Sequence, residues 1–252
     1  MRESARAIRA RINGPRPATL ELQERGAMRA DGALRGCAVF GCGRPPQAKA
    51  GKGVSLFYCR YHAQAHNRHG CHWKKTYSAA DLEPYRRAAR RFIRSHPHDP
   101  WVVHALFALE EMLRRCGPVE RMVDTYTRGP AEKARAAFAR LRRREVPAER
   151  LLVNYLAVCC AIEEDPIRPG SETENYRRVQ AAKACARLAA TTDTYLPLRN
   201  RRYARSSGLM LVRLGRMLEE ACEFVHAYHL SAILALAKEA GASRGGPDAA
   251  TR

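Results

Sequence analysis

Four residues in the first third of the chain have the types and the spacing of a metal site. Four residues separate Cys37 from Cys42, and two separate Cys59 from His62, so the formula is C-x4-C-x16-C-x2-H. Zn²⁺ takes four thiolate or imidazole donors in a tetrahedron, and each close pair can supply one edge of it. The spacing predicts one structural zinc ion on these four residues, because four protein ligands leave no open position for water.

The same segment contains other donors that could replace His62 or build a second site. His66 lies one helical turn beyond His62 and is the closest alternative ligand, and His69 follows it. Cys71 and His72 are adjacent, so their side chains diverge. His62 is preferred because two intervening residues bring both donors of a pair to one metal ion. Thiols that bind no metal are the remaining alternative.

Local signals predict the backbone around these donors. Gly41 and Gly43 flank Cys42 and indicate a tight turn. The apolar run at 54–59 predicts a short strand, and the residues after Cys59 predict a helix with His62 in its first turn.

This segment resembles a small zinc finger of phage and mobile-element proteins that often precedes an HNH endonuclease domain. The shared pattern is C-x-x-x-G-C-x-R-P, then Y-C-x-x-H, then R-H-G, and it is matched here by Cys37, Gly41, Cys42, Arg44, Pro45, Tyr58, Cys59, His62, Arg68, His69 and Gly70. The resemblance covers residues 35–72 only, and it implies zinc on Cys37, Cys42, Cys59 and His62 together with contact to DNA. The loop between the two pairs is longer than in the compact form, and the HNH catalytic residues are not found downstream.

The positive charge of the chain is concentrated around this segment. The 252 residues carry a net charge of +20, and residues 1–97 hold 20 Lys/Arg against 6 Asp/Glu. No acidic residue occurs between Asp31 and Asp81. A field of one sign on one module indicates a polyanionic partner, most simply nucleic acid. A basic surface that only maintains solubility is the alternative.

The predicted nucleic-acid contacts fall into two groups. Those in and directly after the zinc segment are Arg44, Lys49, Lys52, Arg60, Arg68, Trp73, Lys74 and Lys75. Cations need only point outward to contact phosphates, and Trp73 can either stack on a base or pack over the zinc site.

The second group lies on a predicted helix at 85–94. Ser78 and Asp81 are expected to cap its start, and Pro84 is expected to restart it. The apolar positions of a buried face are Tyr85, Ala88, Ala89, Phe92 and Ile93, and the opposite side carries Arg86, Arg87, Arg90, Arg91 and Arg94. Arginines without interleaved acids repel one another, so they favour an anionic partner over a merely solvated face. The predicted contacts on this helix are Arg86, Arg87, Arg90 and Arg94.

The rest of the sequence predicts further helices. One helix is expected to begin at Asp99 and Pro100 and to end at Gly117-Pro118. The others fall within residues 128–144, 146–165, 171–190 and 208–241. A capping box from Ser171 to Glu174 begins the third of these, and the last forms either one helix or two. The linker at 191–208 could be another nucleic-acid contact or a surface loop.

The predicted fold class is mainly α, with a small N-terminal zinc-binding module followed by a multi-helix domain. The expected boundaries are a basic flexible arm at 1–35, the zinc module at 36–76, the helical domain at 77–241 and a disordered tail at 242–252. Cys159, Cys160, Cys185 and Cys222 are expected to be buried on helix faces.

The chain has no phosphate-binding glycine loop, no G-x-S-x-G motif and no H-E-x-x-H motif. These features favour a nucleic-acid-binding protein, with DNA preferred over RNA and a regulatory or accessory role, rather than an enzyme. A diverged HNH-type zinc-dependent nuclease and a helical protein-interaction adaptor are the alternatives. A cytoplasmic, nucleoid-associated location is expected, since no apolar run approaches the roughly 18 residues of a membrane span. The C-terminal helix could join copies of the chain.

Overall fold

The computed structural model describes residues 36–46, 57–119, 127–165, 172–189 and 208–242. These residues form seven α-helices and one short 3₁₀ helix, with no strand among them, which confirms the mainly α fold class. The chain divides between Lys75 and Thr76 into two compact units, one residue from the predicted boundary. The predicted arm at 1–35, the linker at 191–207, Ser171 and the tail at 243–252 lie outside the described residues.

The described part of the first unit contains one helix, α3 (Arg60–His69). Cys59 is its N-cap, and the helix ends at Gly70, whose φ of 84° and N–H bond to the His66 carbonyl form a left-handed C-cap. The strand predicted at 54–59 is wrong where it can be judged, because residues 57 and 58 form a bend. A single backbone bond, from the Ala38 N–H to the Phe57 carbonyl at 2.7 Å, joins the bend to the preceding turn.

The second unit begins with α4 (Ala79–Ser95), whose start is capped as predicted. The Ser78 hydroxyl accepts the Asp81 N–H at 3.2 Å, and the Asp81 carboxylate accepts the Ser78 N–H at 2.7 Å. The predicted restart at Pro84 is wrong, because the helix runs through this proline without a break. Pro84 deprives only the Ala80 carbonyl of a partner, and Ala80 is exposed to water.

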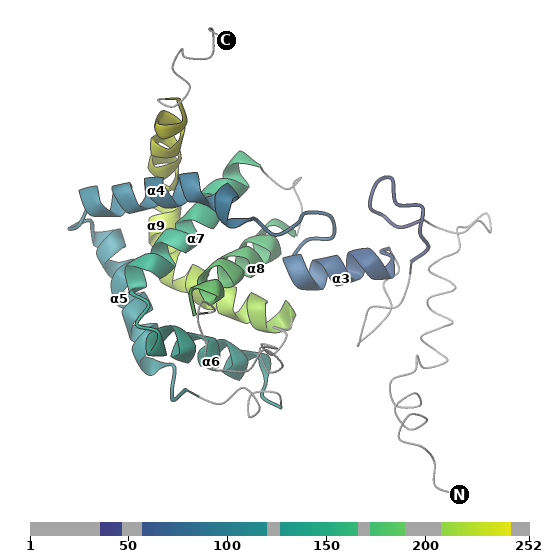
Figure 1. Cartoon of the computed structure of the whole chain (residues 1–252), viewed down its shortest axis with the longest axis horizontal. Coiled ribbons are helices and arrows are strands. Elements are labelled where there is room, and N and C mark those ends of the chain that lie inside the picture. Colours follow the sequence, from purple (N-terminus) through teal and green to yellow (C-terminus); the bar gives the residue numbers. More distant parts are fainter. Residues whose placement is uncertain (1–35, 47–56, 120–126, 166–171, 190–207, 243–252) are drawn as a thin grey trace, which may run out of the picture. The chain divides into compact units, whose positions relative to one another are not determined.

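Helix α7 (Ala148–Glu164) is the centre of the second unit (Figure 1). Every residue from 151 to 162 is buried, as expected for a helix with apolar side chains on all faces. It packs against α4, α5 (Pro100–Arg115), α8 (Glu172–Ala186) and α9 (Gly208–Ala242), while α6 (Pro130–Arg143) packs mainly on α9. The 3₁₀ helix η1 (Arg187–Ala189) follows α8 directly.

The predicted start of α5 is also confirmed, since the Asp99 carboxylate accepts the N–H groups of Trp101 and Val102, both at 3.0 Å, and Pro100 occupies the first helical position. Helix α9 is a single helix of 35 residues rather than two. No helix in the described part of the chain combines the length and apolar content needed to cross a membrane.

Helices α8 and α9 approach each other closely at Gly215. A Cβ atom added to Gly215 would overlap the backbone carbonyl group of Arg178. Beside this crossing, the Glu219 carboxylate accepts the Arg177 Nε–H at 3.1 Å and the Arg178 Nε–H at 2.5 Å. Burial alone would raise the pKa of Glu219, but the two guanidinium groups outweigh it and hold this pKa below its usual range. The carboxylate therefore stays ionised and holds the two helices together.

The first residues of the second unit are tied to α7 and α8. Lys183 donates to the Thr76 hydroxyl at 2.8 Å, and the Tyr77 N–H bonds to the buried Gln180 side chain at 3.3 Å. The Tyr77 hydroxyl donates to the Ala161 carbonyl at 3.2 Å. These bonds fix the segment in which the chain enters the helical unit.

Replacement of Gly215 tests the close approach of α8 and α9. Gly→Ala inside an exposed helix normally stabilises by roughly 1 kcal/mol, but here the added methyl group must push α8 away. We expect Gly215→Ala to lower the free energy of unfolding by about 1–3 kcal/mol, measured by urea denaturation. Ser231→Ala, at an exposed position of the same helix, should change it by less than about 0.5 kcal/mol. A stabilising Gly215→Ala would contradict the packing.

Candidate metal centre

The first pair of candidate ligands lies on a short folded-back turn. The Cys42 N–H donates to the Val39 carbonyl at 3.0 Å, and Gly41 has the left-handed φ of 74° that a glycine adopts without strain. The Cys37 N–H donates to the Arg44 carbonyl at 2.8 Å and closes the base of the turn. Both sulfur atoms are thereby brought to one side of the segment.

The second pair lies at the N-terminus of α3. Cys59 is the N-cap residue, and His62 is the third residue of the helix. An N-cap and the third helical residue lie on the same side of the first turn, which is why capping boxes use this spacing. The two-residue separation therefore directs the Cys59 thiol and the His62 ring toward the same point, as the sequence predicted.

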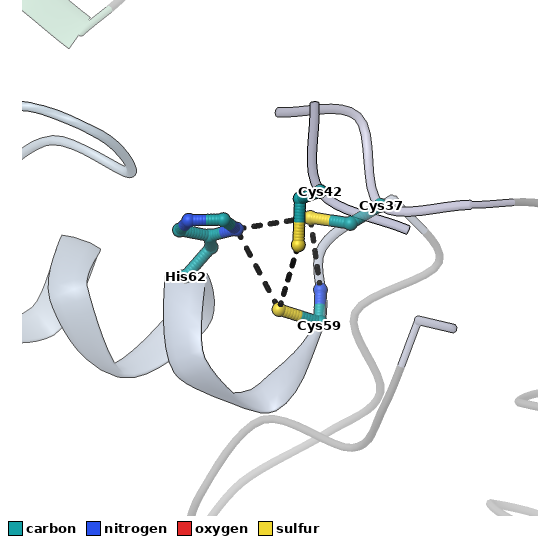
Figure 2. A group of neighbouring side chains, drawn as sticks. All are labelled: Cys37, Cys42, Cys59 and His62. Carbon is teal, nitrogen blue, oxygen red and sulfur yellow. Dashed lines mark hydrogen bonds between the residues drawn. The ribbon is translucent and has the colours of Figure 1, made fainter. Parts of the chain in front are cut away.

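The two pairs converge into one cluster (Figure 2). The Cys37 Sγ lies 3.2 Å from the His62 Nδ1, the Cys59 Sγ lies 3.5 Å from the same nitrogen, and the sulfurs of Cys42 and Cys59 are 3.9 Å apart. All four donor atoms lie within 4.8 Å of one another. None of the three cysteines forms a disulfide. The group is close enough to hold a metal ion.

The environment of two of these donors favours the protonation states that bind metal. Burial lowers the pKa of His62, and the charges of Arg44 and His72 lower it further, so the ring is neutral at neutral pH. Burial acts to raise the pKa of Cys59, but the backbone amides of His62 and Tyr61 and the neighbouring thiols lower it below its ordinary value. A thiolate at a helix N-terminus has this property in general.

Cys37 behaves differently from Cys59. Burial raises the pKa of the Cys37 thiol above its ordinary value, although the Cys59 N–H, 3.3 Å from the sulfur, partly offsets this. The positive charge of a bound cation would favour the deprotonated form of Cys37.

The described residues of the first unit have little other core. In its described part, the buried apolar side chains are those of Pro46, Ala63 and the cysteines at 37, 59 and 71. So small a described core contributes little to stability by itself, and small modules often rely on a metal or on disulfides. None of the nine cysteines forms a disulfide, and a metal held by the four clustered donors would cross-link the two segments of the unit.

The alternative ligands are not part of the cluster. The rings of His66 and His72 stack on each other at 4.4 Å, and His72 also stacks on Tyr58 at 3.4 Å. Cys71 is fully buried. Among the described residues, only Cys37, Cys42, Cys59 and His62 form a group that could hold a metal ion.

The predicted nucleic-acid contacts of the first unit are mostly on its surface. Exposed residues among them are Arg44, Arg60, Arg68, Trp73 and Lys75, whereas Lys74 is partly buried. Trp73 is half-exposed, so part of its ring remains accessible to solvent. Lys49 and Lys52 lie outside the described residues.

Sequence reasoning missed three exposed aromatic residues beside these cations. Phe40 is fully exposed at the tip of the 37–42 turn, and Phe57 and Tyr61 are each 60% exposed. The Arg44 guanidinium lies over the Tyr61 ring, 5.3 Å from its centroid. A phenylalanine directly before the turn glycine was the available signal, because a residue at a turn tip has little to pack against.

The arginines of α4, in the second unit, are not equivalent. Arg86 donates to the buried Asn154 at 2.9 Å, and only 17% of its side chain is accessible. Glu83 lies 3.8 Å from both Arg86 and Arg90, so the expectation of a face without an acidic neighbour is wrong at these two positions. Arg87, Arg91 and Arg94 are exposed and have no acidic partner in the described part of the chain.

Cysteines of the helical unit are buried, as predicted for Cys159, Cys160, Cys185 and Cys222. Burial raises the pKa of both Cys159 and Cys185 to about 12. These thiols are therefore uncharged at neutral pH, in contrast to Cys59, whose pKa is lowered.

Loss of one cluster ligand should release the metal. We expect Cys59→Ser to lose the metal that elemental analysis finds in the wild-type chain, at about one ion per chain. The first unit should unfold while the helical unit keeps its thermal transition, because the cluster belongs to the first unit alone. His66→Ala is the matched control and should retain the metal. Metal retained by Cys59→Ser, or lost by His66→Ala, would contradict this ligand set.

Chelation should expose one group of thiols and not the other. With metal bound, we expect a chromogenic disulfide reagent to react slowly with the protein at pH 7.5. Addition of a chelator should make Cys37, Cys42 and Cys59 react, while Cys159 and Cys185 stay protected until the helices unfold. Mass spectrometry of the labelled peptides identifies the sites, and early labelling of Cys159 or Cys185 would contradict the assignment.

The case for a metal site rests on the geometry of the four donors, their protonation states and the small core around them. Comparison of the chain with protein-family models, curated proteins and solved structures found no match.

Proposed function

We propose that this protein binds nucleic acid, with DNA preferred, through a zinc module in which the metal is structural, and that its role is regulatory or accessory. The observation that carries the proposal is the convergence of Cys37, Cys42, Cys59 and His62 inside a segment without acidic residues. The metal and the charge are therefore features of one small unit.

The choice of zinc is supported by donor chemistry and by distances. Three thiols and one imidazole are the ligands of structural zinc sites, whereas Mg²⁺ and Ca²⁺ take oxygen ligands. Zinc–sulfur and zinc–nitrogen bond lengths imply tetrahedron edges of about 3.8 Å between sulfurs and about 3.6 Å between sulfur and nitrogen. The sulfurs of Cys42 and Cys59 are 3.9 Å apart, and the His62 Nδ1 lies 3.5 Å from the Cys59 sulfur. Bound zinc would hold the 37–42 turn against the start of α3.

The choice of nucleic acid is supported by the side chains around that cluster. Arg44, Arg60, Arg68 and Lys75 are exposed, and no Asp or Glu occurs in residues 36–75. Cations of this kind can contact phosphates, and the resulting release of counterions favours binding. The exposed aromatic rings of Phe40, Phe57 and Trp73 can stack on bases, as such rings do in proteins that bind single strands.

The exposed side of α4 offers a second set of phosphate contacts. Arg87, Arg90, Arg91 and Arg94 line a shallow groove of about 530 Å³ together with Ser95. We leave Arg86 out of the proposed interface, because its guanidinium is already bound to Asn154 and to the Ala79 carbonyl within the helical unit.

Salt dependence tests the proposal. Binding of a labelled DNA duplex, and of the corresponding single strand, should weaken steeply between 50 and 200 mM salt, as measured by fluorescence anisotropy. The triple variant Arg87→Gln/Arg91→Gln/Arg94→Gln should bind more weakly. Its log–log salt slope should fall by about 1 for each arginine that no longer binds a phosphate.

The control variant removes the same charge elsewhere in the helical unit. Arg114 and Arg115 pair with Glu111, and Arg216 pairs with Glu220, so Arg114→Gln/Arg115→Gln/Arg216→Gln should leave the slope unchanged. Equal effects of both triple variants would show that only net charge matters. No binding of either strand form at 50 mM salt, or cleavage of the DNA on addition of Mg²⁺, would refute the proposed function.

A further inference from the structure

The described part of the first unit exposes aromatic rings as well as cations. Of its five Phe, Tyr and Trp side chains, Phe40 is fully exposed, Phe57 and Tyr61 are each 60% exposed, and Trp73 is 48% exposed. Burial of these rings would have stabilised the unit, and contacts to phosphates need only cations. Neither folding nor charge therefore accounts for the exposed rings.

Contacts within the unit place three of these rings on neighbouring segments. The Ala38 N–H, two residues before Phe40, donates to the Phe57 carbonyl at 2.7 Å. The Arg44 guanidinium lies over the Tyr61 ring, 5.3 Å from its centroid. The turn that carries Phe40 is thus joined at one end to Phe57 and at the other, through Arg44, to Tyr61. Tyr61 keeps ring area for a ligand despite this contact, because it is still 60% exposed.

Cations accompany these rings. Tyr61 and Arg68 are seven residues apart in α3, a separation that puts them on the same side of the helix and about 10 Å apart along its axis. Both side chains are exposed, and so is Arg44. No Asp or Glu occurs in residues 36–75. A polyanion that passes the rings therefore meets positive charge and no carboxylate of this unit.

The combination of rings and cations distinguishes a single strand from a duplex. In a duplex, the faces of the bases are covered by the neighbouring base pairs, and only the base edges are open in the grooves. A ring can reach a base face there only by unstacking a step, which costs free energy. A single strand offers its base faces directly, and stacking on an aromatic side chain adds to binding for any base.

We propose that the first unit binds single-stranded nucleic acid in preference to a duplex, with bases stacked on Phe40, Phe57 and Tyr61 and phosphates beside Arg44 and Arg68. The inference rests on the proposed function, since it specifies the form of nucleic acid that the zinc module binds. Stacking depends little on base identity, so the binding has little sequence preference.

Paired binding measurements on the full chain test the strand preference. In about 100 mM salt, we expect fluorescence anisotropy to show that a labelled single strand of about 20 nucleotides binds at least about tenfold more tightly than the duplex of the same sequence. Phe40→Ala/Tyr61→Ala should lower the affinity for the single strand at least about tenfold and that for the duplex less than about twofold. The log–log salt slope should stay the same, because no cation is removed.

Two control variants separate stacking from other effects. Phe107→Ala removes a ring that is 61% exposed in the helical unit, where residues 100–113 contain no Lys or Arg, and should bind like the wild type. Tyr61→Phe keeps the ring and should also bind like the wild type. Elemental analysis should find the same metal content in every variant, because none of the substituted residues belongs to the metal cluster.

The outcomes distinguish this inference from the proposed function. Equal affinity of the wild type for duplex and single strand would overturn the inference and leave the proposed function standing, whereas no binding of either form at 50 mM salt would overturn both. Unchanged single-strand affinity of Phe40→Ala/Tyr61→Ala would also overturn the inference. If that variant no longer bound vesicles of phosphatidylserine and phosphatidylcholine that the wild type binds, the rings would belong to a membrane contact instead.

Discussion

The fold of the first unit depends on the convergence of four donor atoms from two short segments. Among its described residues, the buried apolar side chains are those of Pro46, Ala63 and three cysteines, so a metal held by the cluster would be the main link between the 37–42 turn and α3. Cys59 has two roles, as the N-cap of α3 and as a member of the cluster. The positions of the cations and aromatic rings around the cluster are consequently set by the same four residues. This is why we expect ligand loss to remove the metal and the proposed nucleic-acid surface together.

The second unit is stabilised in a different way. Its central helix, α7, is buried on all sides by apolar residues, and α8 and α9 meet at Gly215 with no room for a side chain. The ion pairs of Glu219 with Arg177 and Arg178 lie at the edge of this contact and stabilise it, because the Glu219 carboxylate stays ionised. None of these interactions involves the cluster. Removal of the metal should therefore leave the helical unit folded.

Exposed cations are unevenly distributed over the chain. They occur in the first unit, along α4 and at the end of α6, whereas residues 100–113 of α5 and 217–237 of α9 contain no Lys or Arg. The proposed nucleic-acid contacts therefore belong to the first unit and to α4, where the cations lie on the surface and, except for Arg86 and Arg90, have no acidic neighbour in the described part of the chain.

The sequence by itself determined the features that depend on neighbours along the chain. The caps at Ser78 and Asp99, the helical start that carries His62, and the burial of α7 all follow from spacing within a few residues. Spacing favoured His62 over the donors at 66, 69, 71 and 72, but the convergence of Cys59 and His62 with Cys37 and Cys42 depends on the position of a turn many residues away. Three features became visible only in the tertiary structure. Arg86 donates a hydrogen bond to Asn154, position 215 has no room for a side chain, and the Trp101 ring stacks on Phe224 and Tyr228. Each of these depends on how separate helices pack, which no local pattern encodes.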